Sequence, residues 1–315
     1  MIHLRLSSGT HSLLGLSKTS LDISPATLYF LLGENCYAAC QYCSQQTGGH
    51  DFLSRVRWPH ITLDKVIPRL PSTTARRICI QTLRYPHMVN DLIYLVTQLR
   101  ASNLPLSICV NPLGSKDMKR LKKAGVERIG LGLDCANQRL FHCLKKGVGT
   151  WRNYLSSAHA AQAIFGKVTV HLIVGLGETD YDLLSLMDQL HNDHISTALF
   201  AHTPCGLSLP PPSLERYRVI QLASYLILHR QSTLNDMKFI KGRLVSLDLP
   251  DKNHIDSHAF LTSGCPHCNR PFYNEPVSGP LYNYPRALTW DEQAKAIHHV
   301  SSYLHQGKIL IKGAI

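Results

Sequence analysis

The chain has 315 residues, of which 44% are hydrophobic and 17% are charged. This balance is typical of a folded globular protein and excludes a disordered one. No apolar run reaches the roughly eighteen residues that a transmembrane helix needs, and the N-terminus lacks a secretory signal pattern. We therefore expect a cytoplasmic protein with no membrane partner.

The net charge is +12, from 33 basic and 21 acidic residues. The basic residues are scattered in short pairs, whereas a nucleic-acid surface usually carries a dense basic stripe. The charge thus favours an acidic protein or an anionic small molecule as partner over a nucleic acid. Ten cysteines without a secretory signal do not indicate a disulfide framework, because clustered cysteines in a reducing compartment more often bind metal or do chemistry.

From residue 27 to residue 205, short apolar runs alternate with amphipathic stretches, after a short N-terminal extension at 1–26. The predicted strands are 27–33, 76–82, 106–111, 128–134, 167–175 and 197–203. Asn90 and Ser115 are candidate helix N-caps, and Gly125 and Gly166 are candidate helix stops. Strands that alternate with helices predict an α/β fold with a parallel sheet. Six such units form either an open sheet or a partial barrel, and periodicity does not distinguish the two.

A different composition follows in residues 206–315. The segment GLSLPPPS at 206–213 predicts a rigid connector, and the next stretch predicts a helix from about Leu214 to Arg230. Residues 233–286 are rich in Pro, Gly, Asn and Tyr, which predicts irregular structure. A final amphipathic helix is expected after Thr289 as its N-cap.

Three cysteines, Cys36, Cys40 and Cys43, follow the first predicted strand with the spacing C-x3-C-x2-C. Three thiolates on one loop can bind three irons of a [4Fe–4S] cluster and leave the fourth iron open. A structural zinc site is the alternative, but zinc normally takes four closed ligands. The spacing and its position resemble the hallmark of the radical S-adenosylmethionine (SAM) superfamily. This resemblance implies a partial (β/α)6 barrel and cleavage of SAM to a 5′-deoxyadenosyl radical, with Tyr42 stacked beside the adenine.

A second signature lies in HLIVGLGETD, at residues 171–180, where Gly175, Gly177 and Glu178 end the fifth predicted strand. Glycines before a helix N-terminus allow a ligand to approach the backbone closely, although a plain strand-to-helix turn looks the same. The superfamily resemblance assigns this segment to the adenosine. Asp134 ends the fourth strand as a candidate ribose or substrate ligand or a helix N-cap, and Gln81 at the second strand is comparable.

A second cysteine pair, Cys265 and Cys268, has the spacing C-x2-C, which is typical of a metal-binding turn. Half of a zinc site that tethers the tail is the alternative. Because two ligands do not complete a site, others must come from elsewhere in the chain. Cys79 and Cys109 lie in predicted strands, and Cys205 follows the sixth.

A further resemblance comes from segments spread over nearly the whole chain, including RRICIQTLRYP, HLIVGLGETD and SGCPHCNRPFYNEP. Cys79 and Cys109 correspond to auxiliary-cluster cysteines of biotin synthase, but Thr169 stands where the third would be. The whole pattern is most similar to the two-component lipoyl synthases. That resemblance implies a second, auxiliary Fe–S cluster of [4Fe–4S] type at Cys265, Cys268 and Cys79.

The lipoyl synthase resemblance implies a sulfurtransferase of lipoate biosynthesis that acts on an octanoyl chain attached to a lysine. The implied partners are an acidic octanoylated carrier protein, a homologous second component, and an electron donor such as ferredoxin or flavodoxin. Two other hypotheses stay open: a biotin synthase-like or other C–H functionalising radical enzyme, and a non-catalytic zinc-stabilised binding protein.

Overall fold

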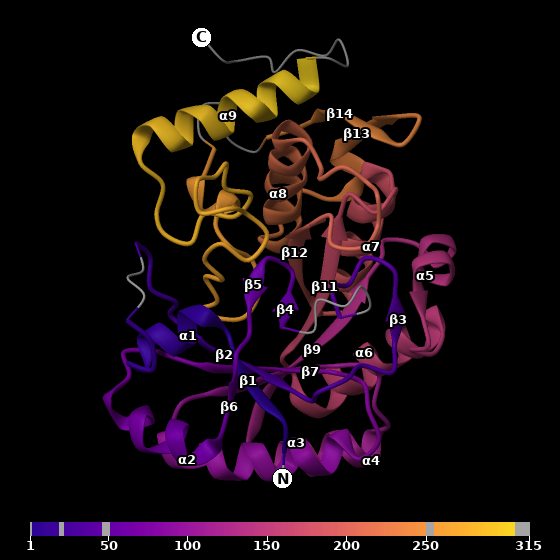
Figure 1. Cartoon of the computed structure of the whole chain (residues 1–315). Coiled ribbons are helices and arrows are strands. Elements are labelled where there is room, and N and C mark those ends of the chain that lie inside the picture. Colours follow the sequence, from indigo (N-terminus) through magenta and orange to yellow (C-terminus); the bar gives the residue numbers. More distant parts are fainter. Residues whose placement is uncertain (1, 19–21, 46–50, 250–254, 306–315) are drawn as a thin grey trace.

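The computed structural model describes residues 2–18, 22–45, 51–249 and 255–305. Its centre is a sheet of eight strands in the order β12-β11-β9-β8-β7-β2-β1-β6 (Figure 1). The six parallel strands confirm all six predicted runs to within about two residues at each end. They are β2 (Leu28–Leu32), β7 (Ile78–Thr82), β8 (Leu106–Val110), β9 (Val126–Asp134), β11 (Val168–Val174) and β12 (Ser196–Ala201).

Each parallel strand presents alternate side chains to its two faces, because successive residues of a strand point in opposite directions. In β2, Leu28, Phe30 and Leu32 are fully buried in the main core, whereas Tyr29 and Leu31 line an internal cavity. Side chains from all six parallel strands line that one cavity, although β2 and β12 do not pair with each other. The sheet is therefore curved but open, and forms a partial barrel.

Helices cover the outer face of this partial barrel (Figure 1). They are α2 (Leu63–Val66), α3 (Met88–Leu99), α4 (Ser115–Ala124), α5 (Gln138–Leu144), α6 (Trp151–Phe165) and α7 (Asp180–Asn192). Gly125 and Gly166 end α4 and α6 in the left-handed conformation, with φ of 114° and 66°, as predicted.

The two predicted N-caps were wrong by small offsets. The N-cap of α3 is His87, so Asn90 lies inside the helix, where its side chain accepts a hydrogen bond from Arg120 at 2.8 Å. The N-cap of α4 is Gly114, and Ser115 is the first helical residue. Neither cap residue is a Ser, Thr, Asp or Asn, and neither makes a side-chain capping hydrogen bond, so the usual signal of a helix start is missing.

Short strands complete the edges of the fold. The strands β1 (Leu4–Leu6) and β6 (His60–Ile61) extend the sheet antiparallel beyond β2, and the helix α1 (Ser8–Leu13) follows β1. Two-stranded pairs are formed by β3 (Ala39–Cys40) with β10 (Lys145–Lys146), β4 (Phe52–Leu53) with β5 (Val56–Arg57), and β13 (Met237–Ile240) with β14 (Arg243–Leu247). Residues of the N-terminal extension thus pair directly with the first barrel strand.

The C-terminal part begins with α8 (Leu214–Leu228), and α9 (Trp290–His305) packs against it. Thr289 caps α9 as predicted, since its hydroxyl accepts from the Glu292 amide at 3.3 Å. The irregular segment between these helices is held by buried Arg218, which donates to the carbonyls of Leu281 and Tyr282 and lies over the Tyr284 ring. No helix in the described ranges has the length and apolar character needed to cross a membrane.

Candidate active site

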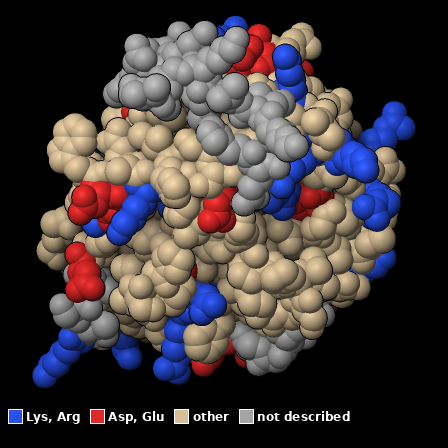
Figure 2. All heavy atoms as spheres, turned by 90° about the horizontal axis from the view of Figure 1, so that it is seen from above, with Lys and Arg blue, Asp and Glu red and all other residues tan. Residues whose placement is uncertain are grey.

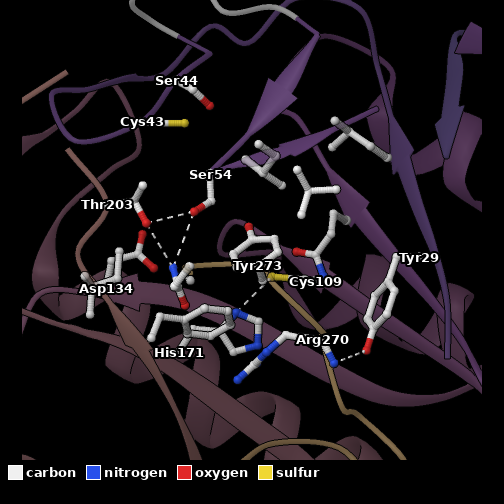
Figure 3. A pocket seen from close by; sticks show the side chains of 18 of the residues that line it. Tyr29, Cys43, Ser44, Ser54, Cys109, Asp134, His171, Thr203, Arg270 and Tyr273 are labelled. Carbon is white, nitrogen blue, oxygen red and sulfur yellow. Dashed lines mark hydrogen bonds between the residues drawn. The ribbon is translucent and has the colours of Figure 1, made fainter. Parts of the chain in front are cut away.

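The cavity inside the partial barrel has a volume of about 280 Å³ (Figure 3). Its wall includes eight of the cysteines together with side chains from every parallel strand. The cysteines are Cys36, Cys40, Cys43, Cys79, Cys109, Cys205, Cys265 and Cys268. The triad Cys36, Cys40 and Cys43 and the pair Cys265 and Cys268, which are more than two hundred residues apart in sequence, therefore share one cavity.

The triad Cys36, Cys40 and Cys43 lies on the loop after β2, which crosses the carboxyl end of the barrel. Cys40 belongs to β3 and pairs with Lys145 of β10, which fixes the middle of the loop. The Arg84 backbone N–H donates to the Cys36 sulfur at 3.5 Å, and the Cys43 amide donates to the Cys40 carbonyl at 3.0 Å. The fold thus holds all three sulfurs at the cavity, as the spacing predicted.

Burial determines the protonation of two of these thiols, Cys40 and Cys43. It raises the pKa of Cys43 to about 12 and also raises the pKa of Cys40, against which the nearby Lys145 ammonium acts in the opposite direction. A thiol with a raised pKa stays protonated at neutral pH. Cys40 and Cys43 therefore become thiolates only when a metal displaces their protons.

Tyr42 and Asp134 lie together at the cavity, and the structure adds a third residue that the sequence did not single out. The Tyr42 hydroxyl donates to Asp134 Oδ2 at 2.6 Å, and Lys145 Nζ lies 2.5 Å from the same oxygen and 3.2 Å from the hydroxyl. Asp134 has φ of 65°, so the strand end turns its carboxylate toward the loop. In sequence Lys145 is one of a basic pair, and only the β3–β10 pairing brings it beside Cys40.

The second predicted signature reaches this cavity only at its start: His171 and Ile173 line the cavity, whereas Gly175, Gly177 and Glu178 are not among its lining residues. Gly175 and Gly177 have φ of 106° and 102°, so both positions need glycine. Glu178 accepts hydrogen bonds from the amides of Gly175 and Leu176, each at 2.8 Å, and from Arg216 of α8 at 3.0 Å. In the described structure Glu178 thus holds its own turn, and contact of this segment with an adenosine stays a prediction.

Gln81 lies on the inner face of β7 and lines the cavity. Its side-chain amide donates to the sulfur of Cys79 at 3.2 Å. This residue therefore lies at the second group of thiols, although the sequence placed it with the cofactor.

The second group consists of Cys79, Cys109, Cys265 and Cys268. Burial is the main cause of the raised pKa of Cys79, and the next causes are the charges of Cys265, Cys268 and Cys109, so the four sulfurs are electrostatic neighbours. Burial likewise raises the pKa of Cys109 to about 12. The structure thus brings together the C-terminal pair with both strand cysteines that the sequence singled out.

The turn that carries the C-terminal pair is anchored at the amino ends of the barrel strands. Arg77 donates to the Pro266 carbonyl at 3.1 Å, and Thr27 donates to the His267 carbonyl at 2.9 Å. Farther in, the Arg270 amide donates to the Tyr29 hydroxyl of β2, and its guanidinium donates to the Leu199 carbonyl of β12. The segment therefore connects β2 with β12, two strands that do not pair with each other.

Two further cavity residues, His171 and Arg270, lie beside the second group (Figure 3). His171 Nδ1 is 3.5 Å from Cys109 Sγ, and Arg270 lies 3.9 Å from the Phe200 ring centre. Burial first, and the nearby Arg270 charge second, lower the pKa of His171 to about 4, so its imidazole is neutral. His171 is also the first residue of the HLIVGLGETD segment.

The remaining candidates lie as follows. Cys205 Sγ is 3.9 Å from the Ser54 carbonyl, and burial raises its pKa. Thr169 is fully buried, and its hydroxyl accepts from Arg128 at 3.4 Å. Cys135 is buried and Cys143 is exposed.

In the part of the chain that the structure describes, no three His, Cys, Asp or Glu side chains are grouped as a single metal ion would require.

Comparison with known proteins gives relatives for part of the chain. A biotin synthase from Hydrogenobaculum sp. is 30% identical over 146 residues, which are 44% of each chain. A biotin synthase from Acinetobacter calcoaceticus is 27% identical over 175 residues, 53% of this chain and 52% of the relative. This chain thus spans about half the length of the biotin synthases that it matches. A GTP 3′,8-cyclase from Limosilactobacillus fermentum is 22% identical over 75% of this chain and 73% of its own.

Among solved structures, the FeFe-hydrogenase maturase HydG from Carboxydothermus hydrogenoformans is similar in fold. Its TM-score is 0.52 at 16% identity, over 65% of this chain and 51% of the maturase. The model of the radical SAM superfamily matches residues 30–190, more than half of the chain, which include the triad loop and the strands β7 to β11. The chain therefore belongs to the radical SAM superfamily, as a biotin-synthase-like member.

Proposed function

We propose that this chain is a sulfur-inserting radical enzyme, one component of a two-protein lipoyl synthase that acts on an octanoyl chain carried on a lysine. The observation that carries this proposal is the second group of thiols, which shares one cavity with the triad. Superfamily membership implies a [4Fe–4S] cluster with SAM, and many reactions begin that way. A second thiol group within the same space supports a reaction that also needs a sulfur source.

The triad has the chemistry that such a cluster requires. Its donors are three soft thiols on one loop, and the Arg84 N–H already points at the Cys36 sulfur, as is usual for cluster thiolates. A four-iron cluster bonds each thiolate to a different iron, so the three sulfurs need not converge on one point. When bound, the cluster supplies the electron that cleaves SAM.

We propose that Tyr42, Asp134 and Lys145 bind the SAM molecule beside the triad. They form one hydrogen-bonded group at the cavity, with an aromatic ring, a carboxylate and an ammonium as the available contacts. The charges of Asp134 and Lys145 cancel, so the pair adds no net charge to the barrel, and the Lys145 ammonium can still donate a hydrogen bond to an anionic group of SAM. We also keep the backbone at Gly175 and Gly177 as a proposed adenosine contact.

For the auxiliary site we propose Cys79, Cys265 and Cys268 as ligands of a second [4Fe–4S] cluster. The mutual charge effects of these thiols and the buried Arg270 beside them support the assignment, since the arginine offsets thiolate charge. Cys109 is the fourth thiol of the group. Gln81 lies here, with its amide on the Cys79 sulfur, and donates to that ligand.

The alternative is a biotin synthase-like reaction, and the relatives that carry this name support it. The fully buried Thr169, at the position of the third auxiliary cysteine, and the additional C-terminal pair favour the lipoyl synthase proposal.

The proposed partners are an acidic octanoylated carrier, a homologous second component, and ferredoxin or flavodoxin. Figure 2 shows basic and acidic side chains interspersed on one face, and the net charge of +12 supports an acidic partner.

The test is anaerobic reconstitution of the full chain, followed by incubation with SAM, reductant and either octanoylated carrier or dethiobiotin, with and without the homologous component. We expect sulfur to be gained by the octanoyl carrier, measured by mass spectrometry. Sulfur on dethiobiotin alone would favour the alternative, and stoichiometric zinc without sulfide would contradict both.

Metal analysis gives a separate readout. We expect about eight irons per chain from two [4Fe–4S] clusters, and about four in Cys265→Ala. The matched control is Cys143→Ala, because Cys143 is exposed and is not among the residues that line the cavity. Equal iron in Cys265→Ala and in the unmodified chain would contradict the auxiliary site.

A further inference from the structure

One side of the cavity is a compact apolar wall. Tyr29, Leu31, Trp58 and Leu83 are buried and pack together as a cluster separate from the main core. Leu53 and Val56, from the β4–β5 hairpin, pack against it. All six residues also line the cavity. The hairpin therefore completes an uncharged surface that begins on β2.

Both thiol groups touch this apolar wall. Cys36 of the triad packs against it, and so do Cys79 and Cys268 of the second group. The wall is thus the surface along which the two proposed cluster sites are connected. A ligand that lies on the wall is therefore close to Cys36 and also to Cys79 and Cys268.

Elsewhere the cavity is lined by polar and charged side chains, among them Asp134, His171 and Arg270 (Figure 3). Lys145 also lines the cavity. Asn274 also belongs to this polar side, where its amide donates to Thr203 at 3.2 Å. An apolar ligand would displace water from these groups without offering them a hydrogen bond, which costs free energy, whereas it fits the apolar wall. The apolar wall therefore favours the apolar part of a substrate, and the other side of the cavity favours its polar part.

We propose that this apolar wall binds an unbranched acyl chain in an extended form and sets the length and composition of that chain. This inference rests on the proposed function and gives the place where its substrate lies. A saturated chain offers no polar atom for recognition, so buried apolar area must supply its affinity. A chain along this wall presents successive methylene groups near Cys36 at one side and near Cys79 and Cys268 at the other.

The same wall discriminates against a polar substrate. The ureido ring of dethiobiotin carries hydrogen-bonding groups that would be left unpaired against leucine and valine side chains. We therefore expect the wall to prefer a simple acyl chain to dethiobiotin, even though two of the relatives reported above are biotin synthases.

The test measures binding, without turnover, to the reconstituted full chain with SAM and no reductant. The probes are lysine amides acylated on the side chain with acetyl, hexanoyl or octanoyl groups, and binding is followed by calorimetry. Each methylene that the wall buries improves the dissociation constant by about fourfold, so octanoyl should bind about fifteenfold more tightly than hexanoyl.

A substitution localises the chain. Val56→Trp fills the space in front of the wall and should weaken octanoyl-lysine binding by about tenfold, equivalent to the loss of roughly two methylenes. Val277→Trp is the matched control, because Val277 is 70% exposed and does not line the cavity. SAM binding should be retained in both, which shows that the barrel is intact.

The results separate this inference from the proposed function. Equal affinity for hexanoyl and octanoyl probes in the unmodified chain overturns the wall as the acyl site, even if the octanoyl carrier gains sulfur. Equal effects of Val56→Trp and Val277→Trp on octanoyl binding do so as well. A normal chain-length dependence without sulfur insertion supports the acyl site and rejects the proposed reaction.

Discussion

Lys145 and Asp134 form a buried ion pair, with 2.5 Å between Nζ and Oδ2, directly beside the cysteine triad. Their side chains are only 5% and 17% exposed. Burial alone would lower the pKa of Lys145, but the attraction of the Asp134 carboxylate raises it well above its ordinary value. Lys145 therefore stays charged across the neutral range, and its loss would leave a buried carboxylate without its cation.

We predict that Lys145→Met lowers the free energy of unfolding by about 3–5 kcal/mol, the cost of breaking a buried ion pair by removing one partner. The neighbouring exposed residue gives the control, since Lys146→Met should change stability by less than about 0.5 kcal/mol. Denaturant unfolding of both variants checks this. Similar stability of the two variants would mean that the pair contributes little to folding.

Arg77 connects the barrel to the turn of the second cysteine pair. Its guanidinium is buried, donates to the Pro266 carbonyl and Ser107, and lies 2.8 Å from Glu127. We predict that Arg77→Met lowers the iron content at the second site while the triad site keeps its iron, because the Cys265–Cys268 turn loses an anchor. Arg76→Met changes an exposed neighbour and should leave the iron content unchanged. Loss of iron from both sites alike would show a general folding defect.

Glu178 holds the turn between β11 and α7. Its side chain is fully buried and accepts hydrogen bonds from two backbone amides and Arg216. Glu178→Gln places an amide group where a donor needs an acceptor, so we expect a loss of about 2 kcal/mol in unfolding free energy. Asp188→Asn, on the same α7 helix, is the control and should be nearly neutral. Thermal unfolding measures both.

A pH-dependent contribution comes from Glu292 at the start of α9. Its carboxylate accepts from both guanidinium nitrogens of Arg286, at 2.7 and 2.9 Å. These hydrogen bonds are the first cause of the lowered pKa of Glu292, which is about 2. Because the folded pKa lies below the unfolded one, the stabilisation is complete above about pH 4.3 and is lost as the pH falls toward 2.

We therefore predict that Glu292→Gln is less stable than the unmodified chain by about 1 kcal/mol at pH 7, a value reduced for the partial exposure of the pair. The difference should shrink below about pH 4 and vanish near pH 2. Asp291→Asn, at the preceding residue, is the control, because it removes one carboxylate but keeps the Arg286–Glu292 hydrogen bonds. Unfolding curves at several pH values measure the effect, and a difference that grows toward low pH would reverse the sign of this argument.

Much of the barrel follows from local sequence. The six runs from 27–33 to 197–203 became the six parallel strands, because strands buried on both faces need apolar residues and helices between them need amphipathic stretches. The spacing of Cys36, Cys40 and Cys43 likewise brought three thiols to one loop, since neighbours in sequence cannot move far apart. Local signals failed at His87 and Gly114, which begin helices without a capping side chain.

The sequence by itself determined the succession of strands and helices along the chain, the resemblance to the superfamily, and the placement of Cys36, Cys40 and Cys43 on one loop. Only the tertiary structure decided that Cys265 and Cys268 meet Cys79 and Cys109, that Lys145 lies beside Cys40, and that Glu178 turns toward Arg216. The physical reason is range. Spacing and periodicity act over a few residues, whereas these contacts depend on how a curved, open sheet is filled by a segment that arrives from the far end of the chain.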